Sequence, residues 1–485
     1  MQTRRTFLKQ SLLATASLAT WSGCQTVPHR PRSRVLGANE TICVGVVGFG
    51  GRGQDHIKAF RSLPNVRVTA LCDADRAILD REVRRFQDRG EVVEAYTDLR
   101  TLLEKARVDV VSIATPNHWH ALAAIWAVQA GKDVYVEKPG SHNVFEGHQL
   151  VQAARKYGAI VQVGTQCRSS QGLREAIEWI QSGQLGPIIR VRGLCYKRRE
   201  SIGRTYGPQP IPASVDYDLW LGPAPLKPLR RARLHYDWHW IWDTGNGDLG
   251  NQGVHQMDIA RWILGRQELA PTVWAVGGRL GYLDDGETPN TLIVFHDYKP
   301  APLLFEVRGL PEKAGSNRMD DYSGASIGVV VDCEGGRMVI PSYTRAIVYD
   351  RNGREIRVFD GGGNHYANFI EAVRARRPDR LHADAQEGHL SAALCHVANI
   401  SYRLGTTGTP EAIRDALHHQ AEMAEMFARM YEHLRANQAD FQLTPLVVGR
   451  LLRIHPGRKT FIGDRQANMM LTREYREPFV VPRRV

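Results

Sequence analysis

The stretch that decides the fold is Thr41–Asp75, TICVGVVGFGGRGQDHIKAFRSLPNVRVTALCDAD. It predicts, in order, a buried strand, a glycine turn, a helix and a second strand. In a dinucleotide fold the first glycine permits a tight turn, the second lets a pyrophosphate approach the backbone, and the third lets the helix pack on the strand. A nucleotide site is therefore predicted; the alternative is a plain βαβ turn whose glycines serve packing alone. The turn has the pattern G-x-G-x-x-G and consists of Gly48, Phe49, Gly50, Gly51, Arg52 and Gly53.

Asp73 stands at the end of the predicted second strand. A dinucleotide fold places there the carboxylate that hydrogen-bonds the ribose 2′-hydroxyl. Because a carboxylate would repel a 2′-phosphate, the predicted cofactor is NAD. Arg76, which follows closely, keeps NADP open as an alternative.

Strands and helices continue to alternate up to residue 164, which predicts a parallel, doubly wound sheet. Further strands are expected at 95–98, 108–114, 133–136 and 160–163. Ligands of such sheets bind at the carboxyl ends of the strands. Two polar segments at such ends supply further candidates for cofactor binding, namely Thr115, Pro116, Asn117, His120, Glu137 and Lys138.

The pattern changes after residue 165 and predicts a second α/β domain with an open-faced, mostly antiparallel sheet. Its strands are expected at 188–196, 272–277, 290–296, 303–308, 327–332, 337–340 and 346–350, and its helices at 171–182, 248–264, 364–375 and 387–404. The predicted parts of the chain are a signal and tether (1–38), a Rossmann NAD(P)-binding domain (39–164), a substrate-binding domain (165–415), and a C-terminal helix over 418–438 with an unassigned tail (416–485).

The N-terminus predicts export rather than folded structure. Arg4 and Arg5 lie in a segment that resembles the twin-arginine export signal, and an apolar run over 12–21 follows. The tripeptide Ser22-Gly23-Cys24 is similar to a lipobox, so a lipid anchor at Cys24 and ordinary cleavage nearby are both left open. We expect the protein to be periplasmic, or membrane-anchored and facing the periplasm.

Composition narrows the range of partners. The chain has 485 residues and a formal net charge of +12, but six basic residues and no acid lie in residues 1–36, which leaves +6 for the rest. Basic and acidic residues are interspersed there without a nucleic-acid-binding motif, so no nucleic-acid partner is expected. The seven cysteines show no C-x-x-C spacing, which predicts buried thiols rather than disulfides or a metal site.

The candidates for catalysis are Lys138, Asn251 and His255. A lysine at a strand end beside a nicotinamide can donate to a substrate oxygen, and a histidine can accept the hydroxyl proton. Asn251 and His255 are four residues apart on an expected helix and would share one face, with Asp258 one turn beyond. Taken singly, each of these residues is also compatible with a structural or solvated role.

Five ordered motifs together resemble the Gfo/Idh/MocA family, named after glucose–fructose oxidoreductase and inositol dehydrogenase. They are VVGFGGRG with CDAD, ATPNHWH, VEKPGSHN, VGTQCRSS and GNGDLGNQGVHQMDIARWILG. The resemblance implies a Rossmann domain followed by an open-faced α/β domain, a catalytic Lys138, and His255 as the acid/base. It implies that a homo-oligomer forms through the exposed sheet face. It also implies cofactor contacts from Pro116, Asn117, His120 and Glu137, with Gln166 and Arg168 near the nicotinamide.

One position departs from the family pattern. Sugar dehydrogenases similar to this chain often carry aspartate four residues before the catalytic histidine, where Asn251 stands. An amide cannot act as a base, so Asn251 could only orient the substrate or His255.

The stretch Arg233–Asp243, RLHYDWHWIWD, carries the prediction about the substrate. If it is extended, the indoles of Trp238, Trp240 and Trp242 face one side, where the C–H faces of a sugar could pack. The alternative is that these tryptophans belong to the core of the second domain. Sugar hydroxyls would be bound by polar side chains from Arg233, His235, Tyr236, Asp237 and Asp258.

Export constrains the predicted activity. The periplasm offers no obvious free pool of NAD, so a nicotinamide enzyme there must keep its cofactor bound and restore it in every cycle. The prediction is an NAD(P)-dependent oxidoreductase that acts on a sugar, polyol or glycoside and recycles its cofactor internally. The alternatives are redox-neutral glycoside cleavage through oxidation, elimination, hydration and reduction, known from some relatives of the family, and a non-catalytic exported carbohydrate-binding protein.

Overall fold

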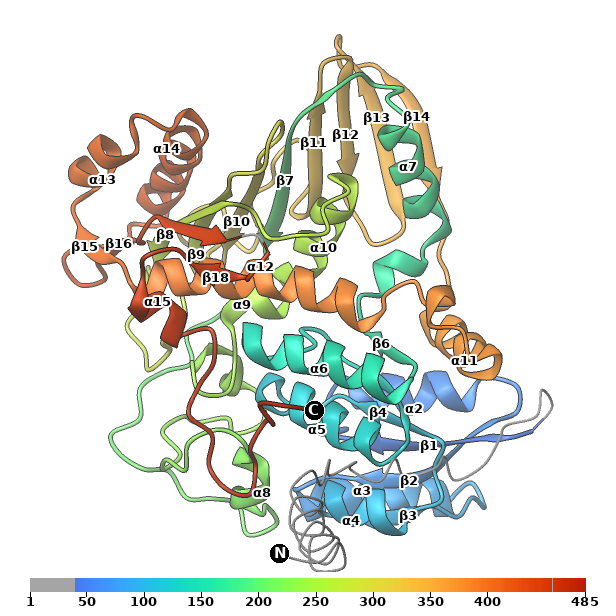
Figure 1. Ribbon diagram of the computed structural model, residues 1–485. Coiled ribbons are helices and arrows are strands. Elements are labelled where there is room, and N and C mark those ends of the chain that lie inside the picture. Colours follow the sequence, from blue (N-terminus) through green and yellow to red (C-terminus); the bar gives the residue numbers. More distant parts are fainter. Residues whose placement is uncertain (1–39, 456) are drawn as a thin grey trace, which may run out of the picture.

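The computed structural model describes residues 40–455 and 457–485. The predicted export signal, Cys24 and the whole of the predicted tether lie outside the described residues. The described chain forms two α/β domains, with α12 (Ala385–Arg403) lying between them (Figure 1). No helix in these residues has both the length and the apolar character needed to cross a bilayer.

The first domain has the predicted doubly wound Rossmann fold. Its six parallel strands lie in the order β3-β2-β1-β4-β5-β6. Helices α2, α3 and α11 pack on one face of the sheet and α4, α5 and α6 on the other. The strands are β1 (Ile42–Val47), β2 (Val66–Cys72), β3 (Glu94–Tyr96), β4 (Val110–Ile113), β5 (Asp133–Val136) and β6 (Val161–Val163). The helices are α2 (Gly53–Arg61), α3 (Arg76–Gln87), α4 (Leu99–Lys105), α5 (Asn117–Gln129), α6 (Val144–Tyr157) and α11 (His365–Ala375).

Capping residues fix where these helices begin and end. The side chain of Asp75 accepts from the Ala77 N–H at the start of α3, and Asn143 accepts from the Glu146 N–H at the start of α6. Gly158 ends α6 with φ of +59°, a left-handed conformation that favours glycine. The caps at Asp75 and Asn143 therefore fix the ends of the loops that follow β2 and β5 at the carboxyl edge of the sheet.

The second domain contains the predicted, mostly antiparallel sheet. Its main path is β14-β13-β12-β11-β7-β10-β9-β8-β16-β15, and β17 pairs with β8 and with β18. β7 and β10 are parallel neighbours. The strands are β7 (Ile188–Tyr196), β8 (Thr272–Gly278), β9 (Thr291–His296), β10 (Leu303–Arg308), β11 (Ile327–Cys333), β12 (Gly336–Ile340), β13 (Arg345–Asp350), β14 (Glu355–Asp360), β15 (Thr406–Gly408), β16 (Leu446–Val448), β17 (Leu452–His455) and β18 (Thr460–Phe461).

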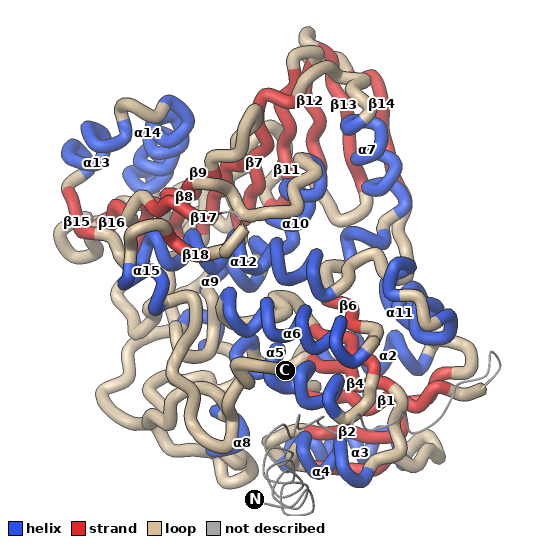
Figure 2. The backbone as a smooth tube through the Cα atoms, viewed as in Figure 1, coloured by secondary structure: helices blue, strands red, loops and turns tan. Residues whose placement is uncertain are grey.

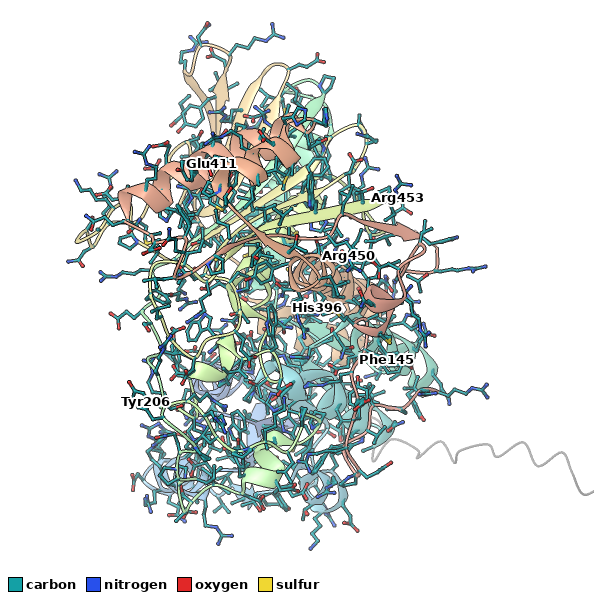
Figure 3. All side chains as sticks on the ribbon, turned by 90° about the vertical axis from the view of Figure 1, so that its left-hand side faces the viewer. Phe145, Tyr206, His396, Glu411, Arg450 and Arg453 are labelled. Atoms are coloured by element: carbon teal, nitrogen blue, oxygen red, sulfur yellow. The ribbon has the colours of Figure 1, made fainter. Side chains whose placement is uncertain are left out.

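The two faces of this sheet are covered differently. The inner face packs on α7 (Gln171–Gln181), α10 (Gly253–Ile263) and α12. The outer face is covered over β8, β9 and β10 by α13 (Pro410–Leu417) and α14 (Ala421–Ala436). Figure 3 shows this helix pair lying across the sheet, with Glu411 labelled on α13.

Three expectations about the second domain are corrected. The single helix expected over 248–264 is two helices, α9 (Gly247–Asn251) and α10, because the chain breaks at Gln252. Strand β14 lacks a strong apolar pattern because five of its six residues are exposed at the sheet edge, and it was not predicted. The expected tail adds short strands to the sheet and α15 (Arg465–Met469), elements too brief to show a periodic pattern.

Two irregular segments close over the first domain. The cover, residues 197–246, is the loop-rich segment at the lower left of Figure 2, with the helices α8 (Tyr217–Leu221) and η2 (Asp237–Trp240). Tyr206, which is 99% exposed, marks its outer edge in Figure 3. The strap, residues 471–485, runs from α15 past the cover and ends beside α5 and α6 (Figure 1). Its side chains Phe479 and Val481 are buried in the core of the first domain.

Candidate functional site

A cavity of about 550 Å³ lies at the carboxyl ends of β1, β2, β4 and β5, where a doubly wound sheet binds its ligands. Its walls come from the first domain, the second domain and the cover. The predicted site residues that line it are Gly48, Gly50, Gly51, Arg52, Asp73, Thr115, Pro116, Asn117, His120, Glu137, Lys138, Gln166, His235, Tyr236, Trp238, Asn251 and His255.

The glycine loop provides space that side chains would fill. Gly48 has φ of +75°, and a Cβ built on it would lie 2.8 Å from the backbone of Thr115. A Cβ on Gly53 would lie 2.1 Å from the Gly48 oxygen, so α2 begins directly against the loop. Apart from Gly51 and its two sequence neighbours, no described residue has an atom within 4 Å of a Cβ built on Gly51. The tight turn, the close helix packing and the open position are what a bound pyrophosphate requires, so the loop fits NAD.

Asp73 is held at the end of β2 by the loop that it faces. Its carboxylate accepts hydrogen bonds from the backbone N–H groups of Phe49 (3.1 Å) and Asp75 (3.0 Å), and burial raises its pKa. The side chain of Phe49 is buried in the core, so this residue reaches the site only through its backbone. Asp73 lines the cavity where a ribose hydroxyl of NAD could donate to it.

Glu137 is the centre of a polar network in the wall of the cavity. Its carboxylate accepts from Arg52 Nε and His56 Nε2, both at 3.1 Å, and from the Lys138 backbone N–H at 3.2 Å. Burial opposes ionisation, but the hydrogen bond from His56 and the charges of Lys138 and Arg52 outweigh it and hold the pKa of Glu137 well below its usual range. Glu137 is therefore an anion that fixes the peptide of Lys138.

Lys138 and His255 line the cavity from the two domains. Lys138 Nζ donates to the backbone oxygen of Asn251 at 2.8 Å, and burial lowers its pKa. His255 is 3% exposed, and its Nδ1 has no hydrogen-bond partner in the described part of the chain. Burial, and then the charge of Lys138, lower the pKa of His255 well below its usual range. The imidazole is therefore neutral near pH 7 and can accept a proton. Asn251 and His255 lie on separate helices, α9 and α10, so they meet at the cavity without sharing a helix.

The segment after β4 joins two strand ends. The ring nitrogens of His120 lie 2.7 Å from the backbone oxygens of Thr115 and Pro139. Asn117 Nδ2 donates to Asn246 Oδ1 of the cover at 3.1 Å. These two side chains shape the cavity wall through contacts within the protein.

A chain of polar contacts adds Gln252 and Tyr343, which were not predicted, and Lys197, for which the sequence favoured solvated surface over the cleft. Lys197 Nζ donates to Gln252 Oε1 at 3.1 Å, and Gln252 Nε2 donates to the Tyr343 hydroxyl at 2.5 Å. The ring of Tyr343 lies 5.1 Å from that of His255. All four residues line the cavity. Lys197 directly follows β7, which is a strand-end signal, whereas Tyr343 lies in a turn between β12 and β13 that gives no such signal.

Two predicted site residues bind each other rather than a ligand. Arg168 donates to Asp258 from Nε at 2.8 Å and from Nη2 at 2.9 Å, and Ser391 of α12 donates to the same carboxylate at 2.7 Å. Both members of the pair are buried, and neither lines the cavity. The structure thus gives Arg168 and Asp258 a structural role in place of the predicted cofactor and substrate contacts.

The aromatic stretch is helical where an extended strand was considered. Residues 237–240 form η2, so the indoles do not share one face. The carboxylate of Asp237 accepts from the Arg233 backbone N–H at 3.0 Å and pairs with the Arg233 side chain at 2.8 Å, which favours a turn over a strand.

Only part of that stretch reaches the cavity. His235, Tyr236 and Trp238 line it, whereas Arg233 and Trp240 do not. Trp240 is buried beneath the guanidinium of Arg199, which lies 5.5 Å from its ring. Trp240 therefore belongs to the core, as the alternative interpretation held.

The cover is fastened to the first domain beside the cofactor end of the cavity. His235 Nε2 lies 2.9 Å from Asp75 Oδ2, and Trp119 Nε1 donates to the Leu219 oxygen at 3.0 Å. Leu219 and Trp220 of the cover line the cavity. Gly222 lets this turn lie against Trp119, because a Cβ there would lie 2.2 Å from the indole.

The strap holds the cover from outside. Arg476 donates to the backbone oxygens of Asp218 at 2.6 Å and Ala224 at 3.1 Å. Arg473 donates to the Asp243 oxygen at 3.0 Å. The strap therefore joins the middle and the C-terminal end of the cover to the first domain, in whose core Phe479 is buried.

Comparison with known families identifies both domains. Residues 42–165 match the oxidoreductase family GFO_IDH_MocA, NAD-binding Rossmann fold. Residues 177–282 match the C-terminal alpha/beta domain of that oxidoreductase family. These two regions are thus similar to the two domains of the Gfo/Idh/MocA oxidoreductases, and the predicted NAD-binding Rossmann fold is confirmed.

Curated relatives match over part of their length. The chain is 34% identical over 168 residues to a glycosyl hydrolase family 109 protein of Shewanella pealeana, covering 32% of this chain and 37% of that protein. It is 30% identical over 201 residues to a glycosyl hydrolase family 109 protein of Saccharopolyspora erythraea, covering 38% of this chain and 44% of that protein. The match therefore spans less than half the length of either relative.

Solved structures share the fold. The WlbA dehydrogenase of Chromobacterium violaceum, in complex with NADH and UDP-GlcNAcA, aligns with a TM-score of 0.56 at 19% identity over 76% of this chain and 95% of that chain. The Bordetella pertussis WlbA dehydrogenase aligns with a TM-score of 0.53 at 20% identity, over 73% of this chain and 94% of that chain.

Proposed function

We propose that this chain, which matches both domain models of the Gfo/Idh/MocA oxidoreductase family, is an NAD-dependent oxidoreductase that acts on a sugar, polyol or glycoside. The observation that carries the proposal is the cavity in which Lys138 and His255 meet beyond the glycine loop. One residue comes from each domain, so a substrate bound between the domains contacts both. The neighbouring Asn251 and Gln252 offer amide groups that suit hydroxyls.

NAD, when bound, takes up a hydride from a carbinol carbon and can return it. The neutral His255 accepts the proton of the substrate hydroxyl. Lys138 donates to the same oxygen and stabilises the negative charge that develops there. The hydrogen bonds of Glu137 hold the Lys138 peptide, and Asn251 holds the ammonium group through its backbone oxygen.

We further propose that the cofactor stays bound between cycles and that the protein acts in the periplasm, either free or anchored at Cys24. The twin-arginine-like segment supports export. The cover and the strap support retention, since Leu219 and Trp220 line the cofactor end and Arg476 holds the turn that bears them.

Redox-neutral cleavage of a glycoside is the second candidate. The names of the curated relatives favour it, and a retained cofactor is compatible with it. In that reaction His255 and Lys138 would first assist oxidation of a hydroxyl. The acidified neighbouring C–H would then lose its proton as the glycosidic oxygen leaves, water would add, and the hydride would return to the keto group.

The test is the nicotinamide absorbance of the purified protein before and after addition of a panel of sugars and glycosides. We expect bound NAD in the protein as isolated, and formation or loss of the NADH band with one class of sugar. Product analysis then separates oxidation from cleavage. His255→Asn and Lys138→Met should abolish the spectral change while NAD stays bound.

The non-catalytic alternative predicts a different result. A protein that binds sugars tightly, with no spectral change and no product for any of them, would be a carbohydrate-binding protein. Sugar binding unaffected by His255→Asn and Lys138→Met would support that outcome.

A further inference from the structure

The substrate end of the cavity is rich in positive charge. The second domain and the cover contribute Lys197 and Arg199 there, and the first domain contributes Lys138. None of the described lining residues that come from the second domain or the cover is a carboxylate. The carboxylates that do line the cavity, Asp73, Asp98 and Glu137, all come from the first domain.

Two of these cations have neutral hydrogen-bond partners. Lys197 Nζ donates to the Gln252 amide oxygen at 3.1 Å, and Lys138 Nζ donates to the Asn251 backbone oxygen at 2.8 Å. Arg199 differs, because Asp248 pairs with it at 2.6 Å from behind the cavity wall.

The balance of charge around the substrate end is positive. Four cations, namely Arg52, Lys138, Lys197 and Arg199, are accompanied by three carboxylates, Glu137, Asp248 and Asp55, while His255 is neutral. Asp55 pairs with Arg52 at 2.9 Å, so four positive and three negative charges leave one positive charge. If Arg52 serves the pyrophosphate of NAD and is set aside together with Asp55, three cations and two carboxylates still leave one.

Asn251 contributes to this balance. Here an amide stands beside Lys138, so the charge of the lysine is left for a ligand. A cation in a partly dehydrated cavity is stabilised by an anionic ligand.

We infer that the substrate is a sugar that carries an anionic group, a carboxylate or a phosphate ester, and that Lys197 binds this group. The inference rests on the proposed function and names its substrate class. The hydrogen bonds from Lys197 to Gln252 and from Gln252 to Tyr343 hold the ammonium group at the cavity wall. Tyr343 packs beside His255, so an anionic sugar bound by Lys197 lies within reach of the proton acceptor.

The experiment is calorimetric titration of the NAD-loaded protein with matched sugars. Methyl glucoside and methyl glucuronide, and the corresponding galactose pair, differ only in the carboxylate, and glucose 6-phosphate presents the ester instead. We expect at least one anionic member to bind about tenfold or more tightly than its neutral partner. Its affinity should fall as salt is added.

Variants assign the effect to Lys197. Lys197→Met should remove the preference for the anionic sugar, while Lys197→Arg should keep most of it. Lys299→Met is the matched control, because that lysine is exposed and pairs with Asp297 at 2.8 Å. Asn251→Asp should weaken binding of the anionic sugar by about tenfold or more through repulsion.

Equal or tighter binding of the neutral sugars, or a preference that survives in Lys197→Met, would overturn the inference. The same experiments test the anion site and the proposed oxidoreductase function independently. A spectral change with a neutral sugar alone overturns the inference and leaves the oxidoreductase standing. Tight, Lys197-dependent binding of an anionic sugar without any spectral change supports the anion site and removes the oxidoreductase.

Discussion

Replacing Phe479 by alanine should speed the release of NAD from the folded protein. Phe479 is 1% exposed and packs edge-on against Trp119, with 5.5 Å between ring centroids. The guanidinium groups of Arg476 and Arg100 lie 4.7 and 5.2 Å from its ring. Loss of a buried phenylalanine costs about 3–5 kcal/mol, and each cation–π contact contributes about 0.5–1 kcal/mol more.

Most of this free energy is lost from the docking of the strap, because Phe479 is one of the two side chains of the strap that are deeply buried in the core of the first domain. Since 1.4 kcal/mol is about a factor of ten, a loss of about 3 kcal/mol raises the undocked fraction of the strap more than about a hundredfold. Undocking releases the bonds from Arg476 to Asp218 and Ala224, and with them the turn that bears Leu219 and Trp220. We therefore expect NAD to dissociate about tenfold faster or more.

The assay dilutes the NAD-loaded protein and traps released NAD with an auxiliary dehydrogenase, while thermal unfolding is recorded in parallel. Met469→Ala is the control, because Met469 is 60% exposed and lies just before the strap. Unchanged NAD release in a Phe479→Ala protein whose Tm has fallen would refute the reasoning, since the cover would then hold without the strap.

Three further predictions follow from local geometry. Gly48→Ala should abolish NAD binding in a fluorescence titration, because its Cβ would lie 2.8 Å from the Thr115 backbone at φ of +75°. The Tm should fall as the pH drops from about 6.5 toward 4. In this range several buried histidines are neutral in the folded state but protonated in the unfolded chain, so the unfolded chain binds more protons and folding is destabilised. Burial lowers the pKa of these histidines to about 3 for His118 and His296 and to about 4 for His239, His365 and His396. Val358→Asp should convert the expected homo-oligomer to a monomer, as measured by light scattering. Val358 is 37% exposed and ends a row of paired apolar residues on the outer face of the sheet, formed with Val330, Val339 and Ile347. A carboxylate there would be buried if a partner chain packed on this face.

The fold of the first domain was predictable because its signals are local. The apolar strands, the glycine turn and the helices succeed one another without interruption. The observed order of the strands in the sheet is the one that a doubly wound fold has. The cofactor half of the site was predictable for the same reason, since Asp73, Thr115 and Glu137 mark strand ends.

The substrate half depends on contacts that no local pattern contains. Arg168 and Asp258 are 90 residues apart, and their ion pair takes both out of the site. Trp240 lies beneath Arg199, which is itself held by Asp248. The strap is a further example, because a tail of 15 residues without periodicity becomes ordered only through burial of Phe479 and Val481 in another domain.

The two ends of the cavity differ in what closes them, and this difference bears on the reaction. Leu219 and Trp220 line the cofactor end beneath the strap, whereas Tyr236 at the substrate end is 44% exposed. Under the proposed function, a sugar would enter and leave at the exposed end while NAD stays bound beneath the cover. An enclosed cofactor can regain its starting oxidation state only through the substrates themselves, either by reducing a second carbonyl compound or by returning the hydride to the same sugar. The Phe479→Ala protein should lose this restriction and turn over with free NAD, because the cofactor could then exchange.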